Sequence, residues 1–420
     1  MDILYVSPYF PPEMGAPAAR VHELARHWVR AGHEVTVLTG FPNQPTGEVP
    51  REYRSKMRRL VYREQVDGIH VVRTWLLPLP NRKAYERILN YSSFFLSSCL
   101  TGTFLHRPDV IIATSPQPLT GLTGWWLARI KRRPYVFEVR DLWPESLTGI
   151  GLGTENSPHI RSLRALPRFL YRSSDHVVVV SPAFKEELVG KWGIAPEKIS
   201  LVENGVETDL FTPDGATDAA QQALGVDDRF VVSYIGTLGL AHGLDVVLRA
   251  AAQLQRTLPK ILFLFVGEGA EKERLVSRVR TEGLANVRFL PQQPRERVSA
   301  LIRGSHVCLV LLRKAEVFKT VIPTKALEFM ACGRPVVLGV DGEARRLLEE
   351  AQAGLFVEPE NSTALAEGIT RLYNSSQLRK TLGDNGRRYI LENLSRERTA
   401  QIYTGVLEKV ILNRKRRRAA

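Results

Sequence analysis

Two kinds of hydrophobic pattern alternate along most of this chain. Short apolar runs rich in Val, Ile and Leu have the length of buried β-strands, and longer segments between them have the period of helices that cover a sheet. In the first half the runs read "DILYVSP" (from Asp2), "HEVTVLTG" (from His33), "GIHVVRTW" (from Gly68), "DVIIATSP" (from Asp109), "PYVFEV" (strand from Val136), "HVVVVSP" (from His176) and "ISLVENGV" (from Ile199). The alternation predicts an α/β fold built on parallel sheets.

The second half repeats this pattern. Its runs read "FVVSYI" (from Phe230), "ILFLFV" (from Ile261), "VRFL" (from Val287), "HVCLVLL" (from His306) and "PVVLG" (from Pro335). A chain of 420 residues is too long for one core and fits two domains of ordinary size. We expect a first domain over residues 1–203, a second over 204–394, and a C-terminal helix with a basic tail over 395–420.

Residues 316–339, "EVFKTVIPTKALEFMACGRPVVLG", are the most informative stretch. Pro323 and Thr324 predict the start of a helix with Thr324 as its N-cap, and Gly333 predicts its end. With the strands before and after it, this stretch forms a β–loop–α–β unit. The N-terminus of its helix faces the carboxyl edge of the sheet, where such folds bind ligands.

Lys319 and Lys325 flank the start of that helix, which the helix dipole already makes positive. Because lysines are unfavourable for stability at this end, they favour a strongly anionic ligand such as a diphosphate. Glu328 lies one turn deeper on the same face as Thr324, where a carboxylate can accept hydrogen bonds from vicinal hydroxyls such as those of ribose. The alternative is an ordinary amphipathic helix with solvated charges.

The stretch "PTKALEFMACGRPVV" resembles the C-terminal signature of retaining glycosyltransferases of family 4. The form F-K-x-x-x-P-[ST]-K resembles their WbuB-like subgroup, which builds bacterial surface polysaccharides. The resemblance implies the GT-B fold: two Rossmann-like domains with a cleft between them and a C-terminal helix that crosses back to the first domain. It also implies that Glu328 holds the ribose of a sugar nucleotide, with Pro323 and Thr324 at the donor site. Thr320 replaces a second glutamate that meets the sugar in the family, so the donor sugar stays open.

A glycine-containing loop after Phe230–Ile235 belongs to the same implied donor site. Gly236 and Gly239 allow backbone N–H groups to approach a diphosphate. Relatives carry Arg and Lys at the positions of Thr237 and His242, and both cations are missing here.

The resemblance therefore implies other partners for the leaving diphosphate. We expect backbone amides and the two lysines, Lys319 and Lys325, to neutralise it, with Arg313 or Lys314 as further candidates.

Two further segments complete the implied donor site. The family's V-G-x-G motif occurs at Gly267 and Gly269, and relatives hold the base through backbone at positions that match Leu290, Pro291 and Gln292.

In the first half, Gly15 and Ala16 lie between the first strand and the helix predicted for residues 16–31. The loop has no G-x-G-x-x-G, which excludes a nicotinamide or flavin fingerprint. The resemblance implies that these small residues let the helix approach the donor diphosphate or the acceptor; an ordinary tight turn is the alternative. Arg140 and Asp141, in "RDLWPES", take the place of a family histidine that contacts the transferred sugar, and a structural Arg–Asp pair is the alternative.

The formal net charge of +14 favours an anionic partner. Basic residues gather in residues 51–63 and in the tail 414–418, and the apolar segment Ile88–Leu105 is interrupted by polar residues. No nucleic-acid motif accompanies the charge, so no nucleic-acid partner is expected. Attachment to an anionic membrane surface is the prediction, with a solvated tail as the alternative. Ile88–Leu105 is expected either to cross over the sheet or to rest one face in a membrane interface.

Few cysteines and no signal peptide predict a cytoplasmic protein, peripheral on the inner face of the membrane. No Ser-His-Asp, Cys-His or zinc constellation can be assembled. The resemblance implies retaining transfer of a hexosyl or N-acetylhexosaminyl unit from a UDP- or GDP-sugar to a lipid-linked saccharide acceptor, without cofactor or metal. The alternatives are a sugar-nucleotide epimerase on the same fold and a non-catalytic basic protein that binds membrane or nucleic acid.

Overall fold

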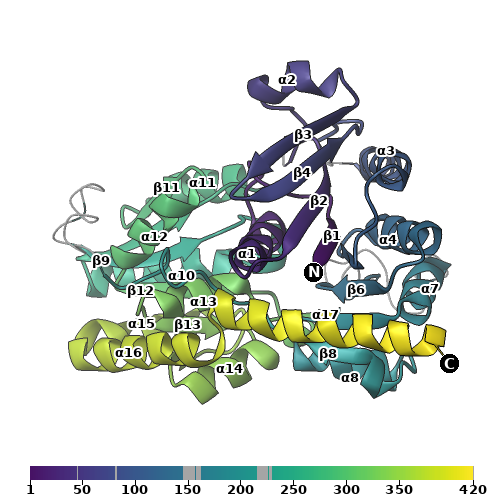
Figure 1. Cartoon of the computed structure of the whole chain (residues 1–420). Coiled ribbons are helices and arrows are strands. Elements are labelled where there is room, and N and C mark those ends of the chain that lie inside the picture. Colours follow the sequence, from purple (N-terminus) through teal and green to yellow (C-terminus); the bar gives the residue numbers. More distant parts are fainter. Residues whose placement is uncertain are drawn as a thin grey trace. The chain divides into compact units, whose positions relative to one another are not determined.

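The computed structural model describes residues 1–44, 46–80, 83–144, 157, 162–214, 226 and 229–419. The chain divides into a first unit of Met1–Leu147, Gly153–Asn204 and Arg396–Ala420, and a second unit that includes Gly205–Ser395. Each unit contains one sheet with helices around it, which confirms the predicted α/β class with two Rossmann-like domains (Figure 1).

The first unit is built on an eight-stranded sheet in the order β3-β4-β2-β1-β5-β6-β7-β8. Its strands are β1 (Asp2–Val6), β2 (Glu34–Gly40), β3 (Val61–Val66), β4 (Ile69–Thr74), β5 (Val110–Thr114), β6 (Tyr135–Val139), β7 (His176–Val179) and β8 (Ile199–Leu201). All pairings are parallel except that of β3 with β4. Every residue of β5 and β6 is buried, as expected for parallel strands covered on both faces.

The edge strand β3 is not predicted by the hydrophobic pattern, because none of its residues is buried and it lies partly in the basic segment. It pairs antiparallel with β4 through Asp67 and Gly68, whose φ angles are 50° and 81°. Asp-Gly with positive φ at both positions is a preferred two-residue hairpin turn, so this dipeptide was the available indication.

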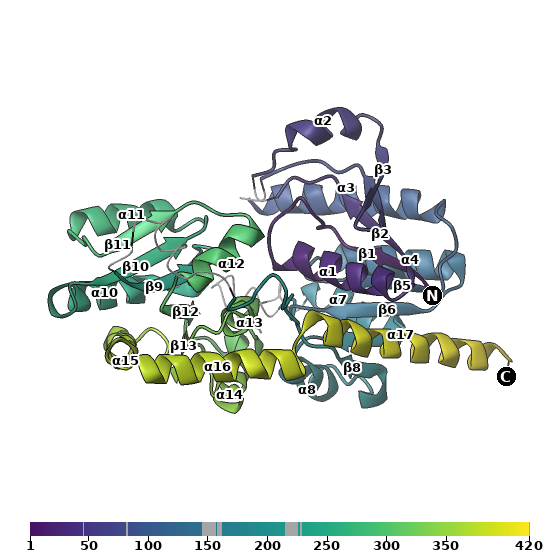
Figure 2. The same ribbon diagram turned by 60° about the vertical axis from the view of Figure 1, so that its left-hand side comes forward.

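The first unit also contains the C-terminal helix. Its helices are α1 (Ala16–Arg30), α2 (Arg51–Met57), α3 (Ala84–Thr103), α4 (Pro118–Lys131), α7 (Ala165–Ser173), α8 (Pro182–Gly190), η1 (Pro196–Lys198) and α17 (Arg396–Ala419). Helix α17 lies beside α1, as Figures 1 and 2 show. Tyr403 packs edge-on against Trp28 with ring centroids 5.4 Å apart, and Arg396 pairs with Glu23 at 2.8 Å. The predicted return of this helix to the first domain is confirmed.

Helix α3 contains most of the apolar segment Ile88–Leu105. Asn90, Phe94, Ser98 and Gly102 recur every four residues on its buried face. The Ser98 hydroxyl is 3.0 Å from that of Thr123 in α4, so the two helices are in close contact. This helix is therefore a crossover between β4 and β5, as one of the two expected roles requires, and the membrane-interface role stays a prediction. Among the helices that the structure describes, none is long and apolar enough to cross a membrane.

The second unit is built on a six-stranded parallel sheet in the order β11-β10-β9-β12-β13-β14. Its strands are β9 (Phe230–Ile235), β10 (Ile261–Val266), β11 (Val287–Leu290), β12 (Val307–Leu311), β13 (Val336–Gly339) and β14 (Gly354–Phe356). Its helices are η2 (Leu240–His242), α10 (Asp245–Thr257), α11 (Lys272–Thr281), α12 (Arg295–Arg303), η3 (Glu316–Thr320), α13 (Thr324–Ala331), α14 (Glu343–Ala351), α15 (Ser362–Asn374) and α16 (Ser376–Asn393).

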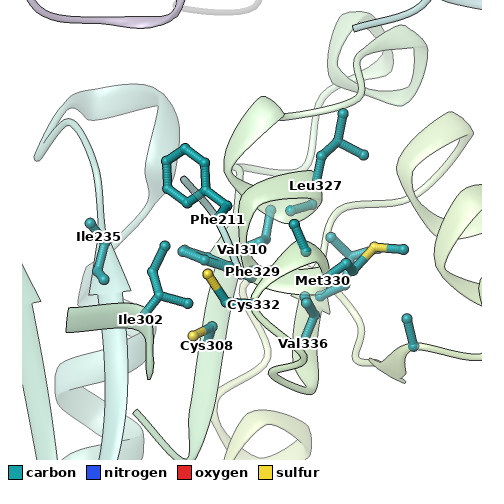
Figure 3. Packing of buried hydrophobic residues seen from close by; sticks show 14 of the residues in the cluster. Phe211, Ile235, Ile302, Cys308, Val310, Leu327, Phe329, Met330, Cys332 and Val336 are labelled. Atoms are coloured by element: carbon teal, nitrogen blue, oxygen red, sulfur yellow. The ribbon is translucent and has the colours of Figure 1, made fainter. Parts of the chain in front are cut away.

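Helix α13 is held by a hydrophobic core that includes β12 and β13. Phe329, Met330 and Cys332 pack there with Cys308 and Val310, all fully buried (Figure 3). The three cysteines of the chain are free thiols.

The start of α13 corrects one prediction. Pro323, with ψ of 121°, is the N-cap, and Thr324 is already the first helical residue, so no side-chain hydrogen bond caps the helix. An N-cap residue needs a non-helical ψ, which Pro323 adopts and Thr324 does not. The predicted end at Gly333, with φ of 64°, is confirmed.

Both borders of the second unit lie one residue later than predicted. Asn204 belongs to the first unit, where its side-chain oxygen accepts a hydrogen bond from Arg20 at 3.1 Å. Ser395 belongs to the second unit, where it forms a parallel bridge with Val206.

A buried ion pair between Arg20 and Glu138 joins α1 to β6 in the first unit. The pair is 2.9 Å long, and its side chains are 1% and 0% exposed. Glu138 also accepts a hydrogen bond from the Tyr5 hydroxyl at 2.6 Å, and Arg20 donates to the Val202 carbonyl at 3.1 Å. Burial by itself raises the pKa of Glu138, but Arg20 and Arg140 hold it below its ordinary value.

We expect Arg20→Met to lower the free energy of unfolding by about 3–5 kcal/mol, because it leaves the Glu138 carboxylate buried without its partner. Urea denaturation of the full chain measures the change. The control is Lys191→Met, which breaks a partly exposed pair with Glu187 on α8 of the same unit and should cost under about 1 kcal/mol. Equal losses in the two variants would contradict the importance of the buried pair.

Candidate functional site

Each sheet has a topological switch point at its first strand in the sequence. β1 has β2 on one side and β5 on the other, and β9 has β10 on one side and β12 on the other. Open α/β sheets bind ligands at the carboxyl ends of the strands beside such a point. A site is therefore expected at the loops that follow β1 and β9.

Backbone contacts bring the ends of β9, β10 and β11 together in the second unit. Gly236 donates its N–H to the end of β10 at 2.9 Å, and Gly267 donates to the Leu290 carbonyl at 3.1 Å. Gly267 has a φ of +146°, and a Cβ there would lie 2.0 Å from the Gly236 carbonyl oxygen. A Cβ on Gly269 would lie 2.3 Å from the Leu238 carbonyl oxygen. These predicted glycines are thus required by close backbone approach.

The Nζ atom of Lys325 is buried beside this loop and has no hydrogen-bond partner among the residues described. It lies 4.0 Å from the centroid of the Tyr234 ring and 3.3 Å from the position of a Cβ on Gly236. Burial lowers the pKa of Lys325 to about 7, against an opposite effect of Glu328. A cation–π contact offsets only part of the cost of desolvating an ammonium group. The position therefore favours an added anion.

Thr237 and His242 lie on the same loop, and neither side chain carries a positive charge. The Thr237 carbonyl accepts a hydrogen bond from the Tyr234 hydroxyl at 2.8 Å, and the His242 N–H donates to the Gly239 carbonyl at 3.1 Å. Burial and the nearby Lys325 lower the pKa of His242 to about 3, so its ring is neutral. Thr237 and His242 therefore supply no positive charge to this loop, and Lys325 is the cation buried beside Gly236.

Glu328 pairs with Arg295, a residue that the sequence analysis missed. The shortest distance between the two side chains is 3.4 Å, and the Arg295 guanidinium also lies 5.1 Å from the centroid of the Phe211 ring. Arg295 is the first residue of α12, at the end of the loop that begins with Pro291. A basic residue directly after "PQQP" was the available indication.

Leu290, Pro291 and Gln292 lie at the end of β11 and directly after it. The Leu290 carbonyl is already engaged by Gly267, and the Pro291 carbonyl accepts from the Gln293 side chain at 3.0 Å. Their role in holding a base stays a prediction.

The other candidate cations differ in where they lie. Lys319 is about 42% exposed and pairs with Glu316 at 2.7 Å, while Lys314 pairs with Glu358 at 2.7 Å. Arg313 lies closer to the glycine loop, since its Cγ is 3.2 Å from the position of a Cβ on Gly243. The structure thus separates the two lysines: Lys325 is buried beside Gly236, and Lys319 faces solvent. The role of Lys319 at a diphosphate stays a prediction.

In the first unit, Arg140 contacts the start of α1. Its guanidinium donates to the Ala16 carbonyl at 3.2 Å and the Pro17 carbonyl at 3.4 Å, next to Gly15 with its φ of 131°. The geometry thereby brings Gly15, Ala16 and Arg140 together. Asp141 lines a small cavity. Residues 145–146 of the predicted motif lie outside the described residues.

Glu13 is a buried carboxylate in the β1–α1 loop that the sequence analysis missed. It accepts hydrogen bonds from the backbone N–H groups of Asn43, Gln44 and Phe10 at 3.0, 3.1 and 3.4 Å. Burial raises the pKa of Glu13 to about 7 despite these bonds. A single acid within "YFPPEMGAPA" was the available indication.

Two family models match the chain, one for each unit. Residues 15–205 match a glycosyl transferase 4-like domain, and residues 217–389 match glycosyl transferases group 1.

In the described ranges, no three His, Cys, Asp or Glu side chains are grouped as metal ligands.

Among similar proteins is the "Putative colanic acid biosynthesis glycosyl transferase WcaI" of Escherichia coli (strain K12), 28% identical over 88% of this chain and 91% of that protein. The sucrose-phosphate synthase of Thermosynechococcus elongatus has a TM-score of 0.76 at 21% identity, over 98% of this chain and 99% of that one. HepE of Anabaena, in complex with UDP and glucose, has a TM-score of 0.73 at 19% identity, over 97% and 99%.

We expect the affinity for UDP to fall by up to about tenfold per pH unit between about pH 7 and pH 9. With its pKa of about 7, free Lys325 loses its proton over this range, whereas a bound diphosphate favours the protonated form, so binding must take up a proton. Calorimetric titration in buffers of different ionisation enthalpy measures both effects. Lys325→Met should bind weakly and without this pH dependence; an unchanged slope in that variant would exclude Lys325 as the titrating group.

We expect Gly267→Ala to weaken UDP binding by about tenfold or more, because its Cβ would displace the Gly236 carbonyl and with it the loop. Gly283→Ala is the matched control, since Gly283 also has positive φ, 63°, but nothing within 4 Å of an added Cβ. The control should keep its UDP affinity. Equal UDP affinities for the two variants would mean that close approach at Gly267 is not needed for binding.

Proposed function

Because the chain is a family 4-like glycosyltransferase with the GT-B fold, we propose that it moves a hexosyl or N-acetylhexosaminyl unit from a UDP- or GDP-sugar to a lipid-linked saccharide, with retention, in the synthesis of a bacterial surface polysaccharide. The UDP in HepE supports the donor class, and the colanic acid named for WcaI supports the pathway class.

The observation that carries the proposal is the Lys325 ammonium, which is buried next to Gly236 and has no hydrogen-bond partner in the part of the chain that the structure describes. A diphosphate at this loop would supply the missing negative charge and accept hydrogen bonds from backbone N–H groups after the end of β9 and at the start of α13. Because Thr237 and His242 contribute no charge, ion pairing with the diphosphate at this loop is assigned to Lys325, with Arg313 beside Gly243 as a further candidate.

Charge stabilisation of the leaving diphosphate is the proposed main contribution to rate. As the sugar–phosphate bond breaks, negative charge grows on the diphosphate, and a cation fixed in a low-dielectric position stabilises that charge more than it stabilises the ground state. In the proposed front-side attack, the departing phosphate accepts the proton of the acceptor hydroxyl. The protein then needs no nucleophile of its own and no metal.

The remaining residues are assigned to positioning. Glu328 is proposed to exchange part of its contact with Arg295 for the ribose hydroxyls when donor binds. In the first unit, Asp141 is proposed to orient a sugar or acceptor hydroxyl, and Arg140, through its bonds to Ala16 and Pro17, to fix the start of α1.

Binding and transfer are tested separately. The purified full chain is titrated with UDP, GDP and ADP, and then incubated with the matching sugar nucleotides, with and without a bacterial lipid extract as acceptor source. Binding of one nucleotide and extract-dependent transfer of sugar to lipid are expected. Conversion of donor without acceptor would instead indicate an epimerase, and absence of binding to every nucleotide would contradict the proposal.

We expect Glu328→Gln to weaken UDP binding at least about tenfold, since hydrogen bonds to a carboxylate contribute about 1.5–3 kcal/mol each. The control ligand is 2′,3′-dideoxy-UDP, which lacks the ribose hydroxyls and should bind both proteins with similar affinity. If the substitution weakened both ligands equally, Glu328 would not be the ribose ligand.

A further inference from the structure

One face of helix α3 is apolar and is not covered by the described residues of the first unit. Its exposed side chains recur at helical spacing opposite the buried face: Tyr85, Ile88, Leu89, Leu96 and Leu100, followed by Phe104 just after the helix. Leu96 and Leu100 are each 66% exposed, and Phe104 is 78% exposed. Soluble proteins expose such side chains singly, whereas a contiguous stripe of them marks an interaction surface.

The apolar surface continues onto two neighbouring helices. Helices α3, α4 and α7 lie in a row along one side of the first unit (Figure 1). Trp126 and Ile130 are exposed on α4, and Phe169 is exposed on α7. The Phe169 ring packs edge-on against Trp125 of α4 with centroids 5.2 Å apart, so the helices share one surface.

The helices that carry these apolar side chains also carry arginines and very few acidic residues. Along the whole of α3, α4 and α7, Glu86 is the single acidic residue. Arg129, Arg168 and Arg172 are exposed on α4 and α7. Arg164, Arg168 and Arg172 recur every four residues and line an open hollow of about 760 Å³ together with Lys191 and Trp192.

We propose that the outer surface of α3, α4 and α7 docks on an anionic lipid bilayer. The apolar side chains enter the interfacial layer, and the arginines of α4 and α7 contact headgroup phosphates. A bilayer fits better than a protein partner because the surface combines a long apolar stripe, aromatic residues and several arginines with one acidic residue on its three helices, as interfacial helices do. The inference deepens the proposed function, since a lipid-linked acceptor resides in such a surface, but its test requires no glycosyl transfer.

The basic segment 51–63 is a weaker candidate for the same role. Leu60 is its one exposed large apolar side chain among the residues described. Arg54 donates to the Val49 carbonyl, and Lys56 lies over the rings of Tyr53 and Tyr62. This segment therefore offers a control of matched charge.

The test is co-sedimentation of the full chain with vesicles of phosphatidylcholine, alone or mixed with phosphatidylglycerol, at low and high salt. We compare Leu96→Ser/Leu100→Ser/Phe104→Ser, Arg129→Gln/Arg168→Gln/Arg172→Gln and the control Arg51→Gln/Arg54→Gln/Arg58→Gln. The native chain should bind the mixed vesicles and be released by salt. The first two variants should partition at least about tenfold less, and the control within about threefold of the native chain.

Near-ultraviolet circular dichroism and UDP titration of each variant report folding and the donor site independently of the vesicles. Failure of the native chain to bind anionic vesicles would overturn the proposal, whether or not UDP binds. A loss as large in the control as in the other variants would also overturn it. Sedimentation velocity tests whether a second copy of the chain occupies this surface instead. If the native chain were a dimer that Leu96→Ser/Leu100→Ser/Phe104→Ser dissociates without loss of vesicle binding, the surface would be assigned to a second copy of the chain.

Discussion

The first unit depends on the ion pair of Arg20 and Glu138, which has no access to water. Arg20 reaches from α1 to β6 and to the carbonyls of Val202 and Glu203, so one guanidinium joins segments more than a hundred residues apart. Because an unpaired charge there would be costly, these segments must come together in one arrangement. That arrangement also fixes the start of α1, where Arg140 holds Ala16 and Pro17.

The second unit contains the opposite situation, a buried cation for which the described residues supply no hydrogen-bonding partner. The Lys325 ammonium lies over the Tyr234 ring without a hydrogen bond to any described residue, and burial lowers the pKa of Lys325 to about 7. Such a lysine reduces the stability of the free protein in the range where it must lose a proton to stay buried. Stability should then rise with pH above about 7, since the unfolded chain still binds that proton up to its ordinary pKa. The cost is reasonable at a binding site, because an anionic ligand offsets it.

Helix α3 shows how one segment can satisfy two demands. Its buried face uses small and polar residues, such as Ser98 and Gly102, because α4 approaches closely: a Cβ on Gly102 would lie 2.6 Å from Leu127. Large aliphatic side chains such as Leu96 and Leu100 are thereby left on the outer face. The polar residues that interrupt the apolar segment therefore reflect helix packing inside the unit.

Local pattern alone determined much of this protein. The apolar runs predicted the parallel strands of both sheets except the short edge strand β14 (Gly354–Phe356), and "PTKALEFMACGRPVV" predicted the helix and indicated the family. The hydrophobic pattern did not predict strand β3, because this edge strand contains no buried run of apolar residues. Its hairpin was indicated by Asp67-Gly68 alone. Tertiary structure decided the rest. The sequence predicts the same role for Lys319 and Lys325 at the start of α13, yet Lys319 faces solvent and Lys325 is buried against Tyr234. Arg295 meets Glu328, and Arg20 meets Glu138, only after the strands are assembled. Periodicity is set by neighbours along the chain, whereas burial and pairing of charge depend on residues that folding brings from far away.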